Sequence, residues 1–161
     1  METVYIQSPI GPARITGDAD GVSVISVCNE PVECSDEIPA VLTEAVFQLR
    51  EYFAGSRTDF TFRINPEGTA FQRNVWRELL QISFGKTVSY LELAKKLGDV
   101  KAIRAVASAN GKNPLWIVVP CHRVIGTDGS LTGYAGGLWR KKWLLEHENP
   151  SGQHALFDAE I

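Results

Sequence analysis

The sequence predicts an α+β protein in which an antiparallel sheet with one helix is followed by a helical part. Short alternating runs rich in β-branched residues fill the first part of the chain, and helical spacing with helix-capping signals dominates after residue 68. Between them, "NPEG" at 65–68 is the best boundary signal in the chain. With 161 residues, 44% hydrophobic and 22% charged, the chain can form one compact domain or two small ones.

The first half is expected to form a sheet covered by a helix. Three strand-like runs, separated by Pro or Gly, predict an antiparallel sheet: "TVYIQS", "ARITG" and "GVSVISV". From Pro39 the pattern changes to an apolar stripe at helical spacing, which stops at Gly55, a typical C-terminal cap. "TDFTFRI" at 58–64 predicts one more strand.

Helix signals multiply in the second half. Thr69 with Gln72 and Ser89 with Glu92 fit the capping box, in which two side chains satisfy unpaired amides at a helix start. "LGDV" predicts a tight turn, and "VKAIRAVASANG" predicts an alanine-rich helix over 100–111. Helix, short glycine-containing turn and helix is the spacing of a helix-turn-helix, a DNA-binding motif that many other helix pairs imitate.

The second helix of this pair has the composition of a groove-binding helix. Its long polar side chains are Lys101 and Arg104, and Ala105 is among the small residues that would let its backbone approach a groove wall. Close packing against a partner helix is the alternative explanation for the small residues. The charge distribution favours DNA: residues 1–66 carry 4 Lys/Arg and 10 Asp/Glu, whereas 67–150 carry 12 and 7, within a net charge of −3.

Cysteine and hydropathy patterns limit the location and the cofactors. Cys28, Cys34 and Cys121 are odd in number and lack CxxC spacing, which argues against a disulfide framework or a zinc finger. No apolar run reaches the roughly 20 residues that cross a bilayer, and the N-terminus lacks a signal-peptide pattern. We expect a cytoplasmic protein without metal, in which Cys28 and Cys34 serve packing.

"VVPCHRVIG" places a thiol beside an imidazole and a guanidinium. "LWIVVP" predicts a buried strand that ends at Pro120 and delivers Cys121 to an edge. Either Cys121 is a nucleophile whose pKa is lowered by His122 and nearby cations, or it is an inert buried thiol. Because neighbouring side chains on extended backbone point to opposite sides, a water relay between Cys121 and His122 is expected rather than a direct bond.

A closing helix is predicted in "GLWRKKWLLEHE". Its apolar positions are Leu138, Trp139, Trp143, Leu144 and Leu145. We interpret Arg140, Lys141 and Lys142 as a solvated face, with phosphate contacts as the alternative. Trp76, Trp139 and Trp143 are interpreted as core residues.

Four segments, in this order, resemble the O6-alkylguanine-DNA alkyltransferases, bacterial type: "FQRNVWRELLQISFGKTVSYLELA", "RAVASANGKNP", "IVVPCHRVIG" and "GYAGGLWRKKWLLEHE". The resemblance is tight over residues 69–148. It implies a ribonuclease-H-like N-terminal domain at 1–66, a winged-helix-like C-terminal domain at 67–150 that contains the helix-turn-helix, and a tail at 151–161. It also implies a monomer that binds double-stranded DNA through the minor groove and flips the damaged base.

The reaction that the resemblance implies is a single-turnover repair. The methyl group of O6-methylguanine, and of O4-methylthymine, moves irreversibly to a cysteine without a cofactor. Two rivals remain: a lesion-binding protein that transfers nothing, and a cysteine hydrolase that regenerates its thiol.

The resemblance also assigns residue roles. Cys121 matches the alkyl acceptor, His122 the base that reaches the thiol through a water, and Glu148 the acid that orients it. Asn113 matches the brace of the active-site turn, and Tyr90 the tyrosine that hydrogen-bonds N3 of the flipped base. Arg104, flanked by Lys101 and Ala105, matches the finger that fills the vacated stack. The expected base pocket is formed by Tyr134, Val124, Ala135, Gly136 and Trp116.

Two departures from the family pattern concern the pocket. Trp116 stands where a second proline often follows the Asn-Pro, and Ala135 stands where serine is frequent, so the pocket width is open. The zinc site of some members uses N-terminal Cys and His, but residues 1–66 contain no histidine, so no zinc is expected.

Overall fold

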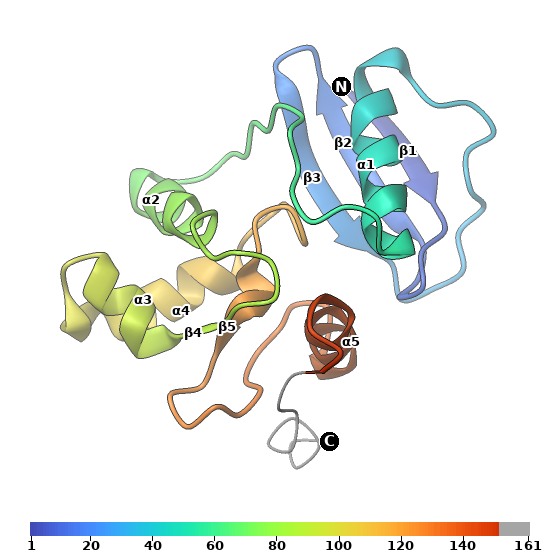
Figure 1. The fold of residues 1–161 in the computed structure, drawn as a ribbon. Helices are drawn as coiled ribbons and strands as arrows, with labels where there is room; N and C mark the ends of the chain where they lie inside the picture. Colours follow the sequence, from blue (N-terminus) through green and yellow to red (C-terminus); the bar gives the residue numbers. More distant parts are fainter. Residues whose placement is uncertain (152–161) are drawn as a thin grey trace. The chain divides into compact units, whose positions relative to one another are not determined.

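The computed structural model describes residues 1–151, which form two compact units. The first comprises Met1–Glu67 with Pro114–Val118, and the second comprises Gly68–Asn113 with the chain from Val119 onward. Apart from residue 151, the predicted tail lies outside the described residues. The predicted α+β class is confirmed, with the sheet in the first unit and most helices in the second (Figure 1).

The first unit is an antiparallel sheet covered by a helix. Its strands are β1 (Glu2–Ile6), β2 (Ala13–Asp18) and β3 (Gly21–Val27), in the order β1-β2-β3. Alternate strand residues are buried, as a sheet with one covered face requires. A 3-10 turn, η1 (Ala40–Leu42), leads into α1 (Thr43–Ala54), which lies along the sheet in Figure 1 and ends at Gly55 with φ of 86°.

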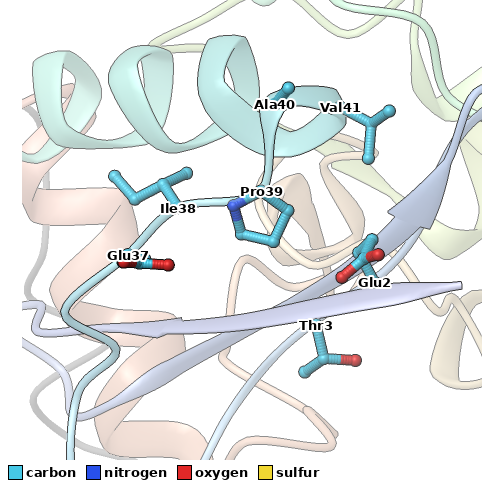
Figure 2. A pocket seen from close by; sticks show the side chains of 7 residues that line it. All are labelled: Glu2, Thr3, Glu37, Ile38, Pro39, Ala40 and Val41. Carbon is cyan, nitrogen blue, oxygen red and sulfur yellow. The ribbon is translucent and has the colours of Figure 1, made fainter.

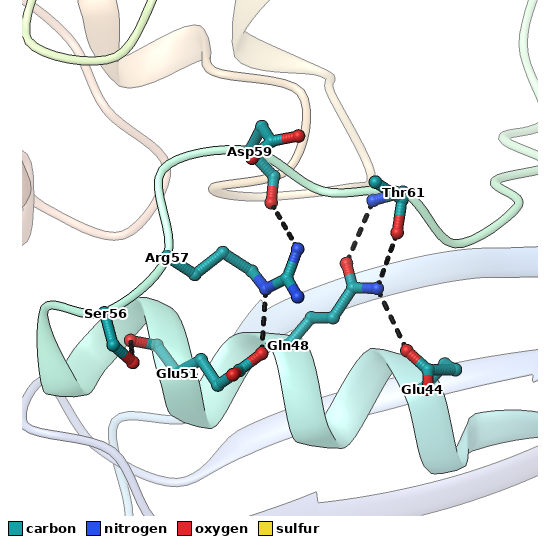
Figure 3. Close-up of polar contacts among 7 residues, drawn as sticks. All are labelled: Glu44, Gln48, Glu51, Ser56, Arg57, Asp59 and Thr61. Carbon is teal, nitrogen blue, oxygen red and sulfur yellow. Dashed lines mark hydrogen bonds and ion pairs between the residues drawn. The ribbon is translucent and has the colours of Figure 1, made fainter.

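The predicted strand at 58–64 is wrong. This segment makes a single parallel bridge, between Val22 and Ile64. The backbone amide of Thr61 donates instead to Gln48 Oε1 at 2.9 Å, and Gln48 Nε2 donates to Thr61 Oγ1 at 2.8 Å (Figure 3). A side chain of α1 thus takes the hydrogen bonds that a neighbouring strand would have taken.

The predicted strand "LWIVVP" is also wrong, because its residues form turns. The Ile25 amide donates to the Pro114 carbonyl at 2.9 Å, and the Trp116 amide donates to the Ile25 carbonyl at 3.0 Å. Residues 114–118, which the sequence analysis assigned to the second domain, therefore pair with β3 in the first unit. Ile117 then turns the chain with a φ of 75°, which is strained for a β-branched residue.

The second unit contains the predicted helix-turn-helix. Its helices are α2 (Ala70–Leu79), α3 (Tyr90–Lys96), α4 (Ile103–Gly111) and α5 (Leu138–Glu148), with 3-10 turns η2 (Val100–Ala102) and η3 (Cys121–Arg123). Two short strands, β4 (Val88–Ser89) and β5 (Val124–Ile125), pair in parallel. Both predicted capping boxes are confirmed, at the starts of α2 and α3.

Burial in the second unit corrects two sequence interpretations. Trp76 is buried as predicted, and its Nε1 donates to the Ala109 carbonyl at 2.9 Å, which ties α2 to α4. Trp139 is 52% exposed and is not a core residue. Arg140 and Lys141, interpreted as solvated, are 3% and 0% exposed. They lie on the inner side of α5, because backbone carbonyls accept from their charged groups.

Candidate active site

Cys121 is the first residue of η3 and is 5% exposed. Its amide donates to the Val119 carbonyl at 2.8 Å, and Pro120, with φ of −82° and ψ of 64°, is the centre of this inverse γ-turn. The backbone at the thiol is thus a tight turn followed by helix. The extended backbone that the sequence predicts around Cys121 is therefore wrong.

Asn113 is in position to brace this turn. Its side chain is buried, and Nδ2 donates to the Val119 carbonyl at 2.7 Å. Burial raises the pKa of the Cys121 thiol, whereas a hydrogen bond from Asn113 and the positive charge of Lys141 lower it. The free thiol is therefore protonated at rest and is surrounded by groups that favour the thiolate.

His122 is linked to the end of α5. Its side chain is fully buried, and Nε2 lies 2.7 Å from Glu148 Oε2. Arg123 binds the same carboxylate in a fork, with Nε 2.7 Å from Oε1 and Nη2 3.1 Å from Oε2. Burial raises the pKa of Glu148, but the charges and hydrogen bonds of His122 and Arg123 lower it by more, so the carboxyl is ionised.

These contacts fix the protonation state of His122. Burial lowers the pKa of His122, despite the opposing effect of Glu148, so the ring is neutral near pH 7. A carboxylate only accepts hydrogen bonds, so the proton is on Nε2 and Nδ1 carries the lone pair. Within residues 1–151, Nδ1 is buried without a hydrogen-bond partner. It is therefore available to accept a proton.

Lys141 is a site residue that the sequence analysis missed. Its Nζ donates to the Val124 carbonyl at 2.6 Å, the Thr132 carbonyl at 2.7 Å and the Gly133 carbonyl at 3.3 Å. Burial lowers the pKa of Lys141 to about 8, and Cys121 opposes this shift. Its spacing in the sequence indicates this burial. Lys141 precedes Leu144 by three residues and Glu148 by seven, so the three side chains lie on the same, buried face of α5.

Tyr90 and Tyr134 are electrostatically coupled to the thiol. Tyr90, the first residue of α3, donates from its hydroxyl to the Thr132 carbonyl at 3.4 Å, and its ring centroid lies 5.9 Å from Lys141 Nζ. Burial raises the pKa of Tyr90 and also that of Tyr134, and Cys121 raises both further. The two phenols are therefore neutral hydrogen-bonding groups near pH 7.

The other predicted pocket residues differ in burial and in the unit to which they belong. Val124 is buried in β5, and Gly136 is buried with its carbonyl accepting from Arg140 Nη1 at 3.0 Å. Ala135 is exposed. Trp116 belongs to the first unit, through its hydrogen bond to β3.

The predicted DNA-contacting residues are exposed. Lys101 lies in η2, and Arg104 and Ala105 lie in the first turn of α4, all on the solvent side of the helix pair. The aliphatic core of α4 points the other way, through Val106 and Ala109.

Three further observations concern other kinds of site. The part of the chain that the structure describes holds no group of three His, Cys, Asp or Glu side chains that could bind a metal ion. None of its helices is long and apolar enough to cross a membrane. A cavity of about 510 Å³ lies in the first unit (Figure 2), and none of its lining residues is a predicted site residue: Glu2, Thr3, Glu37, Ile38, Pro39, Ala40 and Val41.

Family comparisons agree with this arrangement. Residues 70–150 match the 6-O-methylguanine DNA methyltransferase, DNA binding domain, and residues 1–66 match the 6-O-methylguanine DNA methyltransferase, ribonuclease-like domain. A methylated-DNA–protein-cysteine methyltransferase of Methanosarcina acetivorans is 46% identical over 153 residues, covering 92% of this chain and 98% of the relative.

Solved structures are similar over nearly the whole chain. The O6-methylguanine methyltransferase of Mycobacterium tuberculosis has a TM-score of 0.81 at 43% identity, with 94% of each chain covered. A structure of the same organism's protein in complex with DNA has a TM-score of 0.82 at 44% identity, with 91% of each chain covered. The matched domains, the relatives and the geometry around Cys121 agree, and the chain belongs to the 6-O-methylguanine DNA methyltransferase family.

Proposed function

We propose that this chain repairs double-stranded DNA by moving the methyl group of O6-methylguanine, and of O4-methylthymine, to Cys121. The observation that carries the proposal is the environment of the thiol. Cys121 is buried next to a neutral His122, whose Nδ1 has no hydrogen-bond partner within residues 1–151, and the charge of Lys141 favours the thiolate. The named relatives are methylated-DNA–protein-cysteine methyltransferases, which supports the same chemistry.

The first step is loss of the thiol proton. His122 Nδ1 receives it through a water, because no direct bond between the thiol and this ring is observed among residues 1–151. Glu148 stabilises the imidazolium that forms through its 2.7 Å contact with Nε2. Arg123 in turn holds the carboxylate in place, so the acid that orients His122 cannot rotate away.

The second step is in-line displacement at the methyl carbon. The bond between Cys121 Sγ and the methyl group forms as the bond from that carbon to O6 breaks, and the electron pair goes to the guanine ring. Tyr90 donates a hydrogen bond to N3, which stabilises the negative charge that develops on the departing guanine. Guanine then takes up one proton and leaves neutral, and His122 releases the proton that it received from the thiol, so the charges balance. The thioether is stable, so the protein acts once and needs no cofactor.

Base flipping gives the thiol access to its target. A stacked base keeps its O6 substituent away from a buried thiol, so the damaged nucleotide must leave the helix. The exposed α4 presents Arg104 for insertion into the stack from the minor groove, and Lys101 for phosphate. We infer that the protein acts as a monomer and in the cytoplasm, where a reducing environment suits its free cysteines.

Mass spectrometry of the protein after incubation with duplex DNA tests the proposal. A duplex with one O6-methylguanine should add one CH2 unit to the Cys121 peptide, saturating at one per protein, and an unmodified duplex should add none. Binding without mass gain would indicate a lesion-binding protein. Repeated turnover with a free thiol would indicate a hydrolase.

A further inference from the structure

The first unit has no assigned part in the proposed reaction. The residues that carry the steps of that reaction, from Tyr90 to Glu148, lie in the second unit. The sheet of the first unit has two edges, at β1 and at β3. At the β3 edge, Val22 and Ile25 form backbone hydrogen bonds with the segments at 63–65 and 114–116. The β1 edge is therefore the edge with room for a further strand.

The chain itself covers the β1 edge at one residue, Tyr5. The Ser35 amide donates to the Tyr5 carbonyl at 3.1 Å, and the Tyr5 amide donates to Ser35 Oγ at 3.1 Å. Alternate residues of an antiparallel strand direct their amide and carbonyl to the same side, so those of Thr3 also face this edge. Within residues 1–151 these two Thr3 groups have no partner beyond the sheet, and Thr3 is exposed. Thr3 thus presents one open donor and one open acceptor.

The cavity of about 510 Å³ lies beside this open part of the β1 edge. One wall comes from β1, with Glu2 and Thr3, and the other comes from the segment at 37–41 (Figure 2). The second wall is apolar from Ile38 to Val41, and Glu2 and Glu37 contribute exposed carboxylates. No Lys or Arg is among the lining residues. The space beside Thr3 is therefore acidic and partly apolar.

We propose that the β1 edge binds an extended, positively charged peptide segment of another protein, which adds to the sheet beside Thr3. In such complexes, backbone hydrogen bonds to the edge give affinity, and pockets for alternate side chains give specificity. Every second side chain of the added segment faces the cavity. Cationic side chains there pair with Glu2 and Glu37, and an apolar one between them packs against the wall at 38–41.

Charge selects this occupant over two others. A second copy of the chain would bring the same carboxylates to the edge, and like charges oppose edge-to-edge pairing. Nucleic acid is disfavoured because residues 1–66 carry 4 Lys/Arg against 10 Asp/Glu. The β1 edge is therefore an interaction surface whose partner is basic, and it belongs to a different unit from the exposed α4.

The test measures binding of a synthetic peptide to the full chain by fluorescence anisotropy. The probe is fluorescein-labelled Thr-Lys-Thr-Val-Thr-Lys-Thr, whose lysines and valine share one face of a strand. The same peptide with Glu in place of Lys should bind roughly tenfold more weakly. Two further versions are N-methylated, at the valine or at the threonine that follows it. Because successive amides face opposite sides of a strand, only one of these versions should lose binding, by roughly tenfold.

Variants of the chain test the same contacts from the other side. Thr3→Pro removes the open amide, a change that an edge strand tolerates where the N–H faces outward, and Thr3→Val is its control. Glu37→Lys reverses a charge of the cavity. Its control, Glu33→Lys, changes the net charge equally at an exposed position outside the cavity. We expect Thr3→Pro and Glu37→Lys to raise the Kd roughly tenfold, and the controls to keep it. Urea unfolding verifies that each variant is folded.

Four results would overturn the inference, and each leaves the proposed function intact. The first is equal binding of the lysine and glutamate peptides, or binding of neither. The second is an equal effect of the two N-methylations, which would exclude strand addition. The third is an equal loss in Glu37→Lys and Glu33→Lys, which would indicate general charge attraction. The fourth is a wild type that dimerises in sedimentation while Thr3→Pro does not, which would make a second copy the occupant.

Discussion

Glu148 Oε2 lies 2.7 Å from His122 Nε2, and the two side chains are 1% and 0% exposed. This pair joins the last residue of α5 to the residue after the thiol, across 26 positions of sequence. Arg123 completes it with two hydrogen bonds to the same carboxylate and one from Nη1 to the Ile82 carbonyl at 2.7 Å. The residue proposed as the base, His122, is thus held by a buried charged network.

Replacing the acid should impair both activity and stability. In Glu148→Gln, the amide cannot balance the charge of Arg123 or fix the proton on His122 Nε2. We expect methyl transfer to slow by roughly 100-fold, within the usual range for a general base, and the free energy of unfolding to fall by about 3 kcal/mol. Stopped-time methylation assays and urea unfolding measure the two effects.

Glu146→Gln is the matched control for this prediction. Glu146 pairs with Lys142 at 3.7 Å on the surface of the same helix, and its side chain is 42% exposed. Surface pairs contribute roughly 0–1 kcal/mol, so this variant should behave as wild type. Equal losses in the two variants would contradict a special role for the buried network.

Lys141→Met should shift the pH dependence of methyl transfer. Removing a positive charge that favours the thiolate raises the pKa of Cys121, so the rising limb of the rate profile moves to higher pH. We expect transfer at pH 7 to slow by roughly tenfold, with partial recovery at alkaline pH. Lys142→Met, with a partly exposed side chain on the same helix, is the control. A uniform loss at all pH values would indicate a purely structural role.

Acid should destabilise the protein, beginning below about pH 6.5. The pKa of His122 is lowered from 6.5 and that of Glu148 is lowered from 4.5, so the unfolded state takes up protons first at both groups. The unfolding free energy therefore decreases as pH falls through 6.5 and then through 4.5. Urea unfolding at about pH 7.5, 6, 5 and 4 measures the unfolding free energy across the titrations of the two groups. A flat profile would contradict the assigned charge states.

Arg104→Ala should impair repair of duplex DNA while leaving the chemistry intact. Its side chain is exposed on α4, away from the thiol network. We expect methyl transfer from duplex DNA to slow by roughly tenfold, because no side chain then fills the gap that the flipped base leaves in the DNA stack. Transfer from the free base O6-methylguanine should be unchanged. Arg50→Ala, on the exposed side of α1, removes the same charge and should leave both rates as in wild type.

Local patterns determined much of this fold. The strand alternation, the stop at Gly55 and the capping boxes at Thr69 and Ser89 depend on residues within a few positions of one another, and each prediction is confirmed. The resemblance around "PCHRV" gave the family, and the family domains match over the same segments. The roles of Arg104 and Tyr134 stay predictions.

Only the tertiary structure decided where charges and turns lie. Three consecutive basic residues in "WRKKW" predict a solvated face, but carbonyls of the segment at 124–133 bind Lys141 in the interior. "LWIVVP" has the composition of a strand, but its backbone bonds to Ile25 and Asn113 and closes turns from Val118 to Trp116 and from Cys121 to Val119. Each outcome depends on partners distant in sequence, and hydrogen bonding and desolvation between such partners are set only when the chain has packed.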